Sequence, residues 1–245
     1  MTTEEISERF EAIIFDLDGV ITHTADLHYE AWKQLFDELL RKQDSEEPPF
    51  TRQDYEDHVD GKPRYEGVAA FLKSRRIELP WGEEEDSPGW DSIYALGNLK
   101  NDFFHQQMEE KGVETYKDTL ACIQYWKAAH KKMAVVSSSK NCRLVLERAG
   151  LIDTFDAIFD GKDAQKEKVK GKPAPDIFLK AAQQLQVNPG AAVVFEDAIA
   201  GVEAGKKGNF GLVIGVNRGG QEQDMKQAGA DLVIGGLEAL INKKS

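Results

Sequence analysis

Cysteine is scarce in this sequence, with only Cys122 and Cys142 among 245 residues. The two lie far apart, and neither belongs to a Cys-x-x-Cys motif or to a cluster of cysteine and histidine, so no zinc site is indicated. We expect both thiols to be reduced and packed in the interior rather than catalytic, because reactive thiols need an electropositive, accessible setting.

Long apolar runs are also missing. No stretch approaches the ~18 consecutive apolar residues that a membrane span needs. The first ten residues, MTTEEISERF, are acidic and polar and do not resemble a secretory signal. We therefore expect a cytoplasmic protein that does not use a membrane as a partner.

Positive charge is in deficit, because 31 Lys and Arg stand against 43 Asp and Glu, for a formal net charge of −12. This balance argues against nucleic acid or an anionic membrane surface as the main partner. A small anionic substrate remains compatible with it, since a few fixed cations and a metal ion can outweigh the global field locally.

Short apolar, β-branched runs recur along the chain and predict strands at Ile13–Phe15, Met133–Val136, Ala157–Phe159, Ala192–Phe195, Leu212–Val216 and Leu232–Ile234. Helix-like segments lie between most of them. The clearest has an apolar face made of Ile177, Phe178, Ala181, Ala182 and Leu185. This alternation is typical of an α/β fold with a mainly parallel sheet covered by helices on both faces.

The segment 25–108 interrupts the alternation. Its apolar residues recur in helical steps, as in Leu27, Ala31, Leu35 and Leu39, and two polar loops, QDSEEPPF and WGEEEDSPGW, separate the helical stretches. We predict a helical domain at 25–108, inserted into a core domain made of 1–24 and 109–245. An insert after the first strand emerges at the carboxyl edge of the sheet, where open α/β folds bind ligands, so it is a candidate lid.

The first predicted strand leads into Asp16 and Asp18, followed by Gly19. Side chains two apart on a strand point the same way, so these two carboxylates would repel each other at neutral pH. An isolated Asp-x-Asp is often only the start of a loop. A divalent cation such as Mg²⁺ would instead turn the repulsion into a binding site. One aspartate could then attack phosphorus while the other moves a proton.

Three further strand ends carry polar side chains. Ser137 is followed by Ser138–Asn141, a run that suits either a phosphate oxygen or a simple helix cap. Lys172 precedes a proline, which holds it extended, although alone it reads as an ordinary surface lysine. Glu196 and Asp197 end another strand, either as helix-start acids or as metal ligands.

The carboxyl ends of parallel strands meet at one edge of a sheet, so we expect these side chains to gather there. Together they supply a nucleophile, a proton shuttle, a hydroxyl and a cation for phosphate oxygens, and carboxylates for Mg²⁺. The set predicts Mg²⁺-dependent phosphoryl transfer through an aspartyl-phosphate.

The motifs FDLDGVITHT, SSSKN, KPAPDIF and EDAIAGVEAG resemble those of the haloacid dehalogenase superfamily, and more narrowly its β-phosphoglucomutase group. The resemblance covers nearly the whole chain and implies a Rossmann-like parallel-sheet core with an inserted all-α cap. It also implies that Asp16 is the phosphorylated nucleophile and Asp18 the general acid/base. Mg²⁺ would be held by Asp16, the backbone carbonyl of Asp18 and Asp197, with Glu196 in or near the coordination shell.

The same resemblance assigns Ser137 and Lys172 to the transferring phosphate. Within the cap motifs HYEAWK, DGKPR and LKND, it implies that His28 helps to gate proton transfer and that Arg64 binds the distal phosphate. Taken singly, these cap residues would be ordinary boundary or surface side chains. The residues implied to bind substrate are Thr24, His28, Trp32, Gly61, Arg64, Lys100, Asn101, Ser138, Ser139, Lys140 and Asn141.

Three functions follow from this pattern. The first is a mutase that moves phosphate between the 1- and 6-hydroxyls of a hexose, acting as a monomer on a small phosphorylated sugar. The second is a phosphatase for sugar phosphates or other small phosphomonoesters, with water as the acceptor. The third is a catalytically silent binding module on the same fold, which the intact set of core acids and Lys172 disfavours.

Overall fold

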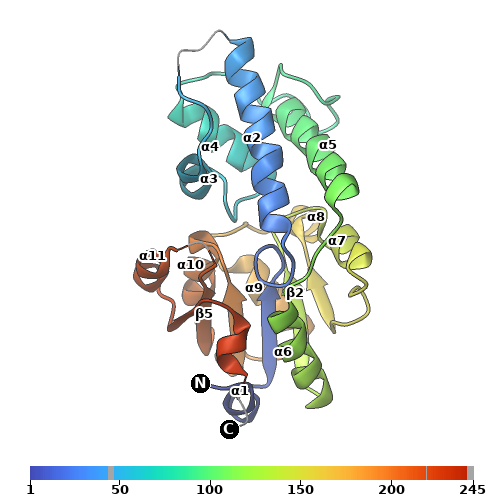
Figure 1. The fold of residues 1–245 in the computed structure, drawn as a ribbon, viewed down its shortest axis with the longest axis vertical. Helices are drawn as coiled ribbons and strands as arrows, with labels where there is room; N and C mark the ends of the chain where they lie inside the picture. Colours follow the sequence, from blue (N-terminus) through green and yellow to red (C-terminus); the bar gives the residue numbers. More distant parts are fainter. Residues whose placement is uncertain (44–46, 219, 242–245) are drawn as a thin grey trace. The chain divides into compact units, whose positions relative to one another are not determined.

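The computed structural model describes residues 1–43, 47–218 and 220–241, and the chain divides into two compact units (Figure 1). The first unit consists of Met1–His23 and Val113–Ser245, and the second of Thr24–Gly112. Residues 44–46, part of the polar loop predicted at QDSEEPPF, lie outside the described residues. In the described part of the chain, no helix combines the length and apolar character that crossing a membrane requires.

The first unit is built on a six-stranded sheet with strand order β3-β2-β1-β4-β5-β6. All neighbouring strands pair in parallel. The order is that of a Rossmann-like doubly wound sheet, which confirms the predicted fold class. Every predicted apolar run forms a strand, and the bounds are β1 (Ala12–Asp16), β2 (Lys132–Val136), β3 (Ala157–Phe159), β4 (Ala192–Glu196), β5 (Leu212–Val216) and β6 (Leu232–Ile234).

Helices cover both faces of this sheet because side chains alternate between the faces along each strand. On one face Ile14 and Val194 pack in a core cluster with Phe178, and the whole apolar face predicted around 177–185 is buried there. On the other face Phe15 stacks on Phe195 with ring centroids 5.4 Å apart, and both contact Trp126. The elements are α1 (Thr3–Arg9), α6 (Lys117–Ala128), α7 (Cys142–Arg148), α8 (Gly161–Glu167), α9 (Asp176–Gln184), η1 (Pro189–Ala191), α10 (Ile199–Lys207), α11 (Glu222–Ala228) and η2 (Leu237–Leu240).

The two cysteines are packed into this unit as free thiols. Cys122 lies on α6 and Cys142 begins α7, and both are fully buried. Burial raises the pKa of the Cys122 thiol to about 12 and that of Cys142 well above its ordinary value. Burial thus favours the protonated thiols, and the prediction that both cysteines are packed in the interior is confirmed.

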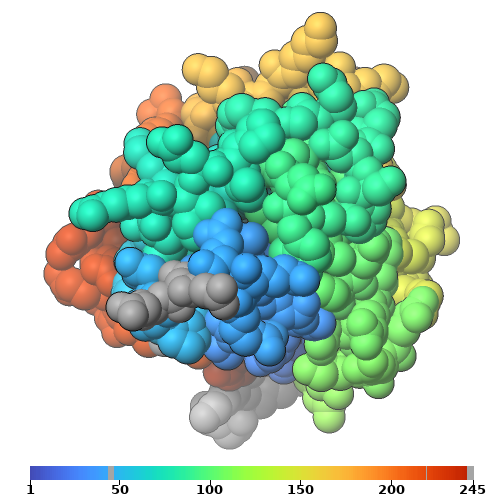
Figure 2. Space-filling model, turned by 90° about the horizontal axis from the view of Figure 1, so that it is seen from above, coloured from blue at the N-terminus to red at the C-terminus, as the bar shows by residue number. Residues whose placement is uncertain are grey.

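The second unit contains helices and loops in its described residues, as predicted for the insert. Helices α2 (Thr24–Lys42) and α5 (Ile93–Lys111) lie side by side (Figures 1 and 2), and α3 (Arg52–His58) and α4 (Arg64–Ser74) complete the unit. The predicted stripe on α2 is buried and contributes to a core of aromatic and aliphatic side chains. The acidic loop WGEEEDSPGW, residues 81–90, forms neither helix nor strand, again as predicted.

Candidate active site

Acidic side chains meet where the strand order of the sheet reverses, between β1 and β4. Phe15 pairs with Phe195 in the parallel register, so Asp16 and Glu196, the last residues of the two strands, lie next to each other. Asp197 follows directly, and one oxygen from each of the three carboxylates lies within 4.8 Å of the others. Hard oxygen donors at this spacing fit a divalent cation such as Mg²⁺.

Lys172 joins two of these acids from the loop between α8 and α9. Its Nζ donates a hydrogen bond to Asp16 Oδ1 and another, 2.7 Å long, to Glu196 Oε2. All three side chains are buried. Since the cluster contains three carboxylates and one ammonium, which pairs with two of them, it keeps an excess of negative charge that a cation would offset.

The protonation preferences of the cluster follow from burial and mutual charge. Burial raises the pKa of Asp16 above its ordinary value, although Lys172 and the backbone amides of Leu17 and Asp18 oppose the rise. Burial, reinforced by the Asp16 charge, raises the pKa of Glu196 to about 8. Burial alone would lower the pKa of Lys172, but the two carboxylates outweigh it and raise that pKa, so the lysine stays cationic.

Ser137 connects the end of β2 to the same cluster. Its hydroxyl donates to Asp18 Oδ2 at 3.3 Å and accepts from the Ser139 amide at 3.0 Å. The Asn141 amide in turn donates to Ser139 Oγ at 3.1 Å. The run 137–141 thus folds as a tight polar turn that opens α7, with Ser138 and Lys140 half-buried beside it.

The turn after β1 depends on Gly19, whose φ of +81° lies in the left-handed region. A Cβ at this position would lie 1.7 Å from Asp197 Oδ2, so a side chain cannot be accommodated without displacing that carboxylate. A Cβ on Gly201 would likewise lie 2.0 Å from the carboxyl carbon of Glu196. The two glycines allow the backbone to approach the acids closely.

The second unit has a polar cluster of its own. Lys100 Nζ lies 2.6 Å from His28 Nδ1, and Arg64 Nη2 donates to Asn101 Oδ1 at 2.7 Å. An ammonium can only donate, so Nδ1 of His28 is the acceptor. Burial, and then the charges of Lys100 and Arg64, lower the pKa of His28 well below its ordinary value. The imidazole is therefore neutral at pH 7.

The remaining predicted residues of the second unit are placed differently. Trp32 is buried in the hydrophobic core and stacks on Phe36, with the Lys100 ammonium 4.9 Å from its ring. Thr24 begins α2 and is fully buried, and Gly61 has a φ of +70° in the turn before α4. The structure thus brings the six core residues together in one unit and His28, Arg64, Lys100 and Asn101 together in the other.

Two polar residues at strand ends, Arg218 and Asp160, were not among the site residues predicted from the sequence. Arg218 lies two residues after β5, and its Nε donates to the Gly19 carbonyl at 3.2 Å. Asp160 directly follows β3 and is fully buried. The rule that polar residues after parallel strands share an edge applies to both and would have found them.

Comparison with known proteins places this geometry in a family. Residues 10–209 match the family model for haloacid dehalogenase-like hydrolases. The chain is 43% identical over 244 residues to the β-phosphoglucomutases of Mycobacterium bovis and Mycobacterium tuberculosis, covering 96% of this chain and 93% of theirs. It is 34% identical to the β-phosphoglucomutase of Bacillus subtilis, covering 91% of this chain and 88% of that one.

A solved structure agrees with the sequence relatives. The crystal structure of β-phosphoglucomutase from Clostridium difficile superposes with a TM-score of 0.76 at 29% identity, covering 94% of this chain and 93% of that chain. The family model spans most of the sequence, and the relatives match over nearly all of it. The chain belongs to the haloacid dehalogenase-like hydrolase family of enzymes.

Proposed function

We propose that this protein is a β-phosphoglucomutase, which converts β-glucose 1-phosphate to glucose 6-phosphate through a hexose bisphosphate. The observation that carries the proposal is the buried cluster of Asp16, Lys172 and Glu196, with Asp18 bonded to Ser137 beside it. It occurs in a chain that is 43% identical to β-phosphoglucomutases along almost its entire length.

In the proposed reaction an Asp16 carboxylate oxygen forms a bond to phosphorus as the bond from phosphorus to the sugar oxygen breaks. Asp18 gives a proton to the leaving oxygen and later takes one from the hydroxyl that receives the phosphoryl group. Lys172 and Ser137 hold the oxygens of the transferring phosphate. The Ser137 hydroxyl also orients the Asp18 carboxylate, which it reaches at 3.3 Å.

The metal in this proposal is Mg²⁺, held by Asp16, Asp197 and the Asp18 carbonyl, with Glu196 in or near the coordination shell. It would supply positive charge against the phosphoryl oxygens. The spacing of the three carboxylates supports this assignment.

The second unit is proposed to be a cap domain, at 25–108, and the first a core domain made of 1–24 and 109–245. Arg64 and Lys100 would bind the phosphate that is not being transferred, together with Asn101. His28, neutral because burial and the neighbouring cations lower its pKa, would help to gate proton transfer. Thr24, Trp32, Gly61 and the turn Ser138–Asn141 complete the proposed substrate-binding set, and we expect a monomer in the cytoplasm.

The test is to follow β-glucose 1-phosphate and Mg²⁺ by ³¹P NMR, with and without a catalytic amount of β-glucose 1,6-bisphosphate. A mutase produces glucose 6-phosphate without matching release of inorganic phosphate, and the bisphosphate accelerates it. Phosphate release equal to substrate loss would instead establish the phosphatase.

In the mutase, Arg64→Ala should reduce bisphosphate use far more than hydrolysis of a simple monoester.

A further inference from the structure

Arg218 is a charged residue that the proposed mechanism does not use, yet its guanidinium contacts the turn that carries Asp18. Its Nε donates to the Gly19 carbonyl at 3.2 Å. Its Nη2 lies 3.0 and 3.3 Å from the two carboxylate oxygens of Asp118, at the start of α6. The guanidinium carbon also lies 3.5 Å from the centroid of the Tyr116 ring.

A second contact holds the next residue of the same turn. Thr119 is fully buried, and its Oγ1 donates to the Val20 carbonyl at 2.8 Å. The same hydroxyl lies 3.4 Å from Nη2 of Arg218. Two consecutive backbone carbonyls after Asp18 are therefore held by side chains that belong to one network.

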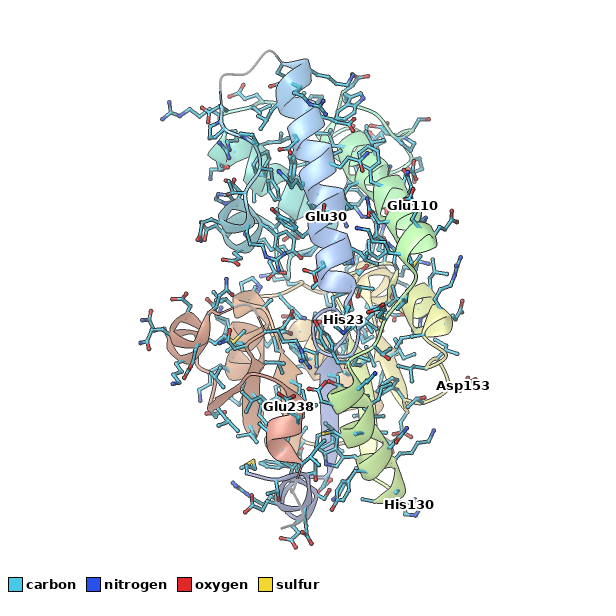
Figure 3. All side chains as sticks on the ribbon, in the orientation of Figure 1. His23, Glu30, Glu110, His130, Asp153 and Glu238 are labelled. Atoms are coloured by element: carbon cyan, nitrogen blue, oxygen red, sulfur yellow. The ribbon has the colours of Figure 1, made fainter. Side chains whose placement is uncertain are left out.

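The network is itself fixed from several directions. Asp118 Oδ2 accepts the Leu237 amide at 2.7 Å. Tyr116 stacks on His23, which is labelled in Figure 3, and the two ring centroids lie 3.7 Å apart. Because its partners are restrained in this way, Arg218 can transmit that restraint to the turn.

The position of this turn bears directly on the proposed metal site. Gly19 sits so close to Asp197 that a Cβ would lie 1.7 Å from its carboxylate. The peptide between Asp18 and Gly19 contains the carbonyl that would be a third ligand. A displacement of Gly19 would therefore move one proposed ligand, the Asp18 carbonyl, and change the space directly beside another, the Asp197 carboxylate. Removal of groups that hold metal ligands in place typically costs roughly 10–100-fold in metal affinity or activity.

We propose that Arg218 and Thr119 are positioning residues for the Mg²⁺ site. They act by holding the Gly19 and Val20 carbonyls in place. The inference rests on the proposed function for the existence of that metal site. It assigns no contact with substrate to either residue.

The experiment is a calorimetric Mg²⁺ titration of the full metal-free chain and of the variants Arg218→Met and Thr119→Val. Methionine keeps an apolar stem against Tyr116 but removes the hydrogen bonds, and valine matches the shape of threonine without its hydroxyl. We expect Arg218→Met to weaken Mg²⁺ binding about 10–100-fold and Thr119→Val to weaken it less. In turnover assays, the Mg²⁺ needed for half-maximal rate should rise while the rate at saturating Mg²⁺ changes little.

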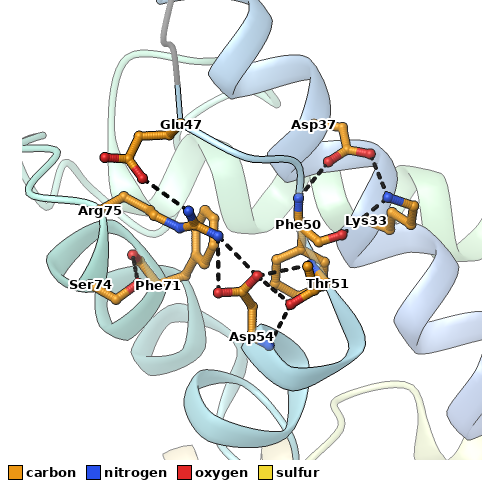
Figure 4. Close-up of polar contacts among 9 residues, drawn as sticks. All are labelled: Lys33, Asp37, Glu47, Phe50, Thr51, Asp54, Phe71, Ser74 and Arg75. Carbon is orange, nitrogen blue, oxygen red and sulfur yellow. Dashed lines mark hydrogen bonds and ion pairs between the residues drawn. The ribbon is translucent and has the colours of Figure 1, made fainter.

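The matched control is Arg75→Met in the second unit. Arg75 also binds both oxygens of one carboxylate, that of Asp54 at 2.9 and 3.0 Å, and lies over an aromatic ring, Phe71, at 5.3 Å (Figure 4). Arg75 belongs to the second unit and the metal site is proposed in the first, so the Arg75→Met variant should bind Mg²⁺ like the parent chain. Thermal unfolding of each variant checks that it is folded.

Unchanged Mg²⁺ affinity in folded Arg218→Met, or an equal loss in Arg75→Met, would overturn the proposal. If Arg218→Met does not fold, Thr119→Val decides the question, and unchanged affinity there overturns it. Calorimetry measures Mg²⁺ binding without turnover, so it tests the positioning role of Arg218 independently of the proposed mutase activity. A parent chain that binds Mg²⁺ but makes no glucose 6-phosphate removes the mutase assignment, while a weaker Arg218→Met still supports the positioning role.

Discussion

The two units each contain a cation between two carboxylates, and the two clusters differ in what they do to the acids. In the first unit Lys172 lies between Asp16 and Glu196, with all three side chains buried. In the second unit Arg75 lies between Asp54 and Glu47, and Glu47 is half exposed (Figure 4). The same charges are therefore arranged in two very different surroundings.

The pKa values of the acids show the consequence. Burial raises the pKa of Glu196 to about 8 in spite of Lys172. At Asp54 burial also acts upward, but hydrogen bonds from Thr51 and the charge of Arg75 outweigh it, so the pKa is lowered. Asp54 also completes a capping box at the start of α3. A cluster that leaves its acids short of positive charge is prepared for a ligand, whereas one that satisfies them stabilises the fold.

The largest difference between the clusters should appear when one acid of each is changed. Asp16→Asn removes the phosphoryl acceptor, so we expect no aspartyl-phosphate and no measurable turnover. Asp54→Asn should keep its turnover and lose only stability. Intact-mass spectrometry after mixing with substrate checks the first result and steady-state assays check the second. A phosphoenzyme in Asp16→Asn would contradict the assignment of the nucleophile.

Asp18→Ala should reduce the rate of phosphoryl transfer on the order of 10²–10⁴-fold, because general acid/base catalysis contributes about that much. The phosphoenzyme should still form, more slowly, since Asp16 is unchanged. Rapid-quench kinetics measure this step. Ser137→Ala offers a milder comparison, because it keeps the Asp18 carboxylate and removes a hydroxyl that bonds to Asp18 and to the Ser139 amide and is proposed to hold the phosphate. A loss in Asp18→Ala no larger than in Ser137→Ala would argue against a proton-transfer role.

Replacing the cations compares the clusters in terms of stability. Lys172→Met leaves two buried carboxylates without their partner, and such changes lower the free energy of unfolding by about 3–5 kcal/mol. Arg75→Met should lower it less, by about 1.5–3 kcal/mol, because Asp54 keeps its bonds to Thr51. Urea unfolding measures both values. Compared with the parent chain at the same Mg²⁺ concentration, added Mg²⁺ should reduce the loss in Lys172→Met and leave the loss in Arg75→Met unchanged. An equal reduction in both would remove the distinction between the clusters.

The smallest expected effect concerns pH and the second unit. The pKa of His28 is lowered well below its ordinary value of 6.5, so the unfolded chain binds this proton more readily than the folded one. Its contribution to stability is therefore complete above pH 6.5 and is lost as the pH falls through the folded-state pKa. His28→Gln should flatten this part of the dependence of unfolding free energy on pH. An unchanged slope between pH 7 and 5 would show that His28 does not titrate in this way.

Local patterns predicted most of the fold. Runs such as Leu212–Val216 need only β-branched side chains and a turn at each end to be recognised as buried strands, and the α2 stripe follows from helical periodicity. The gathering of the site residues was also predictable, because the carboxyl ends of parallel strands meet at one edge of the sheet. Arg218 obeys the same rule, so its place at this edge was predictable. Its hydrogen bond to the Gly19 carbonyl was not, because a backbone carbonyl leaves no mark in the sequence.

The amino-acid sequence by itself determined which chemistry is available, because side-chain types and their positions after apolar runs are local properties. It placed acids after β1 and β4, a serine after β2 and a lysine before a proline. Only the tertiary structure decided that Lys172 lies between Asp16 and Glu196, that Trp32 is buried in the second unit, and that Arg218 holds Gly19. Asp16 and Lys172 are 156 residues apart, and a contact at that separation depends on the order of strands in the sheet.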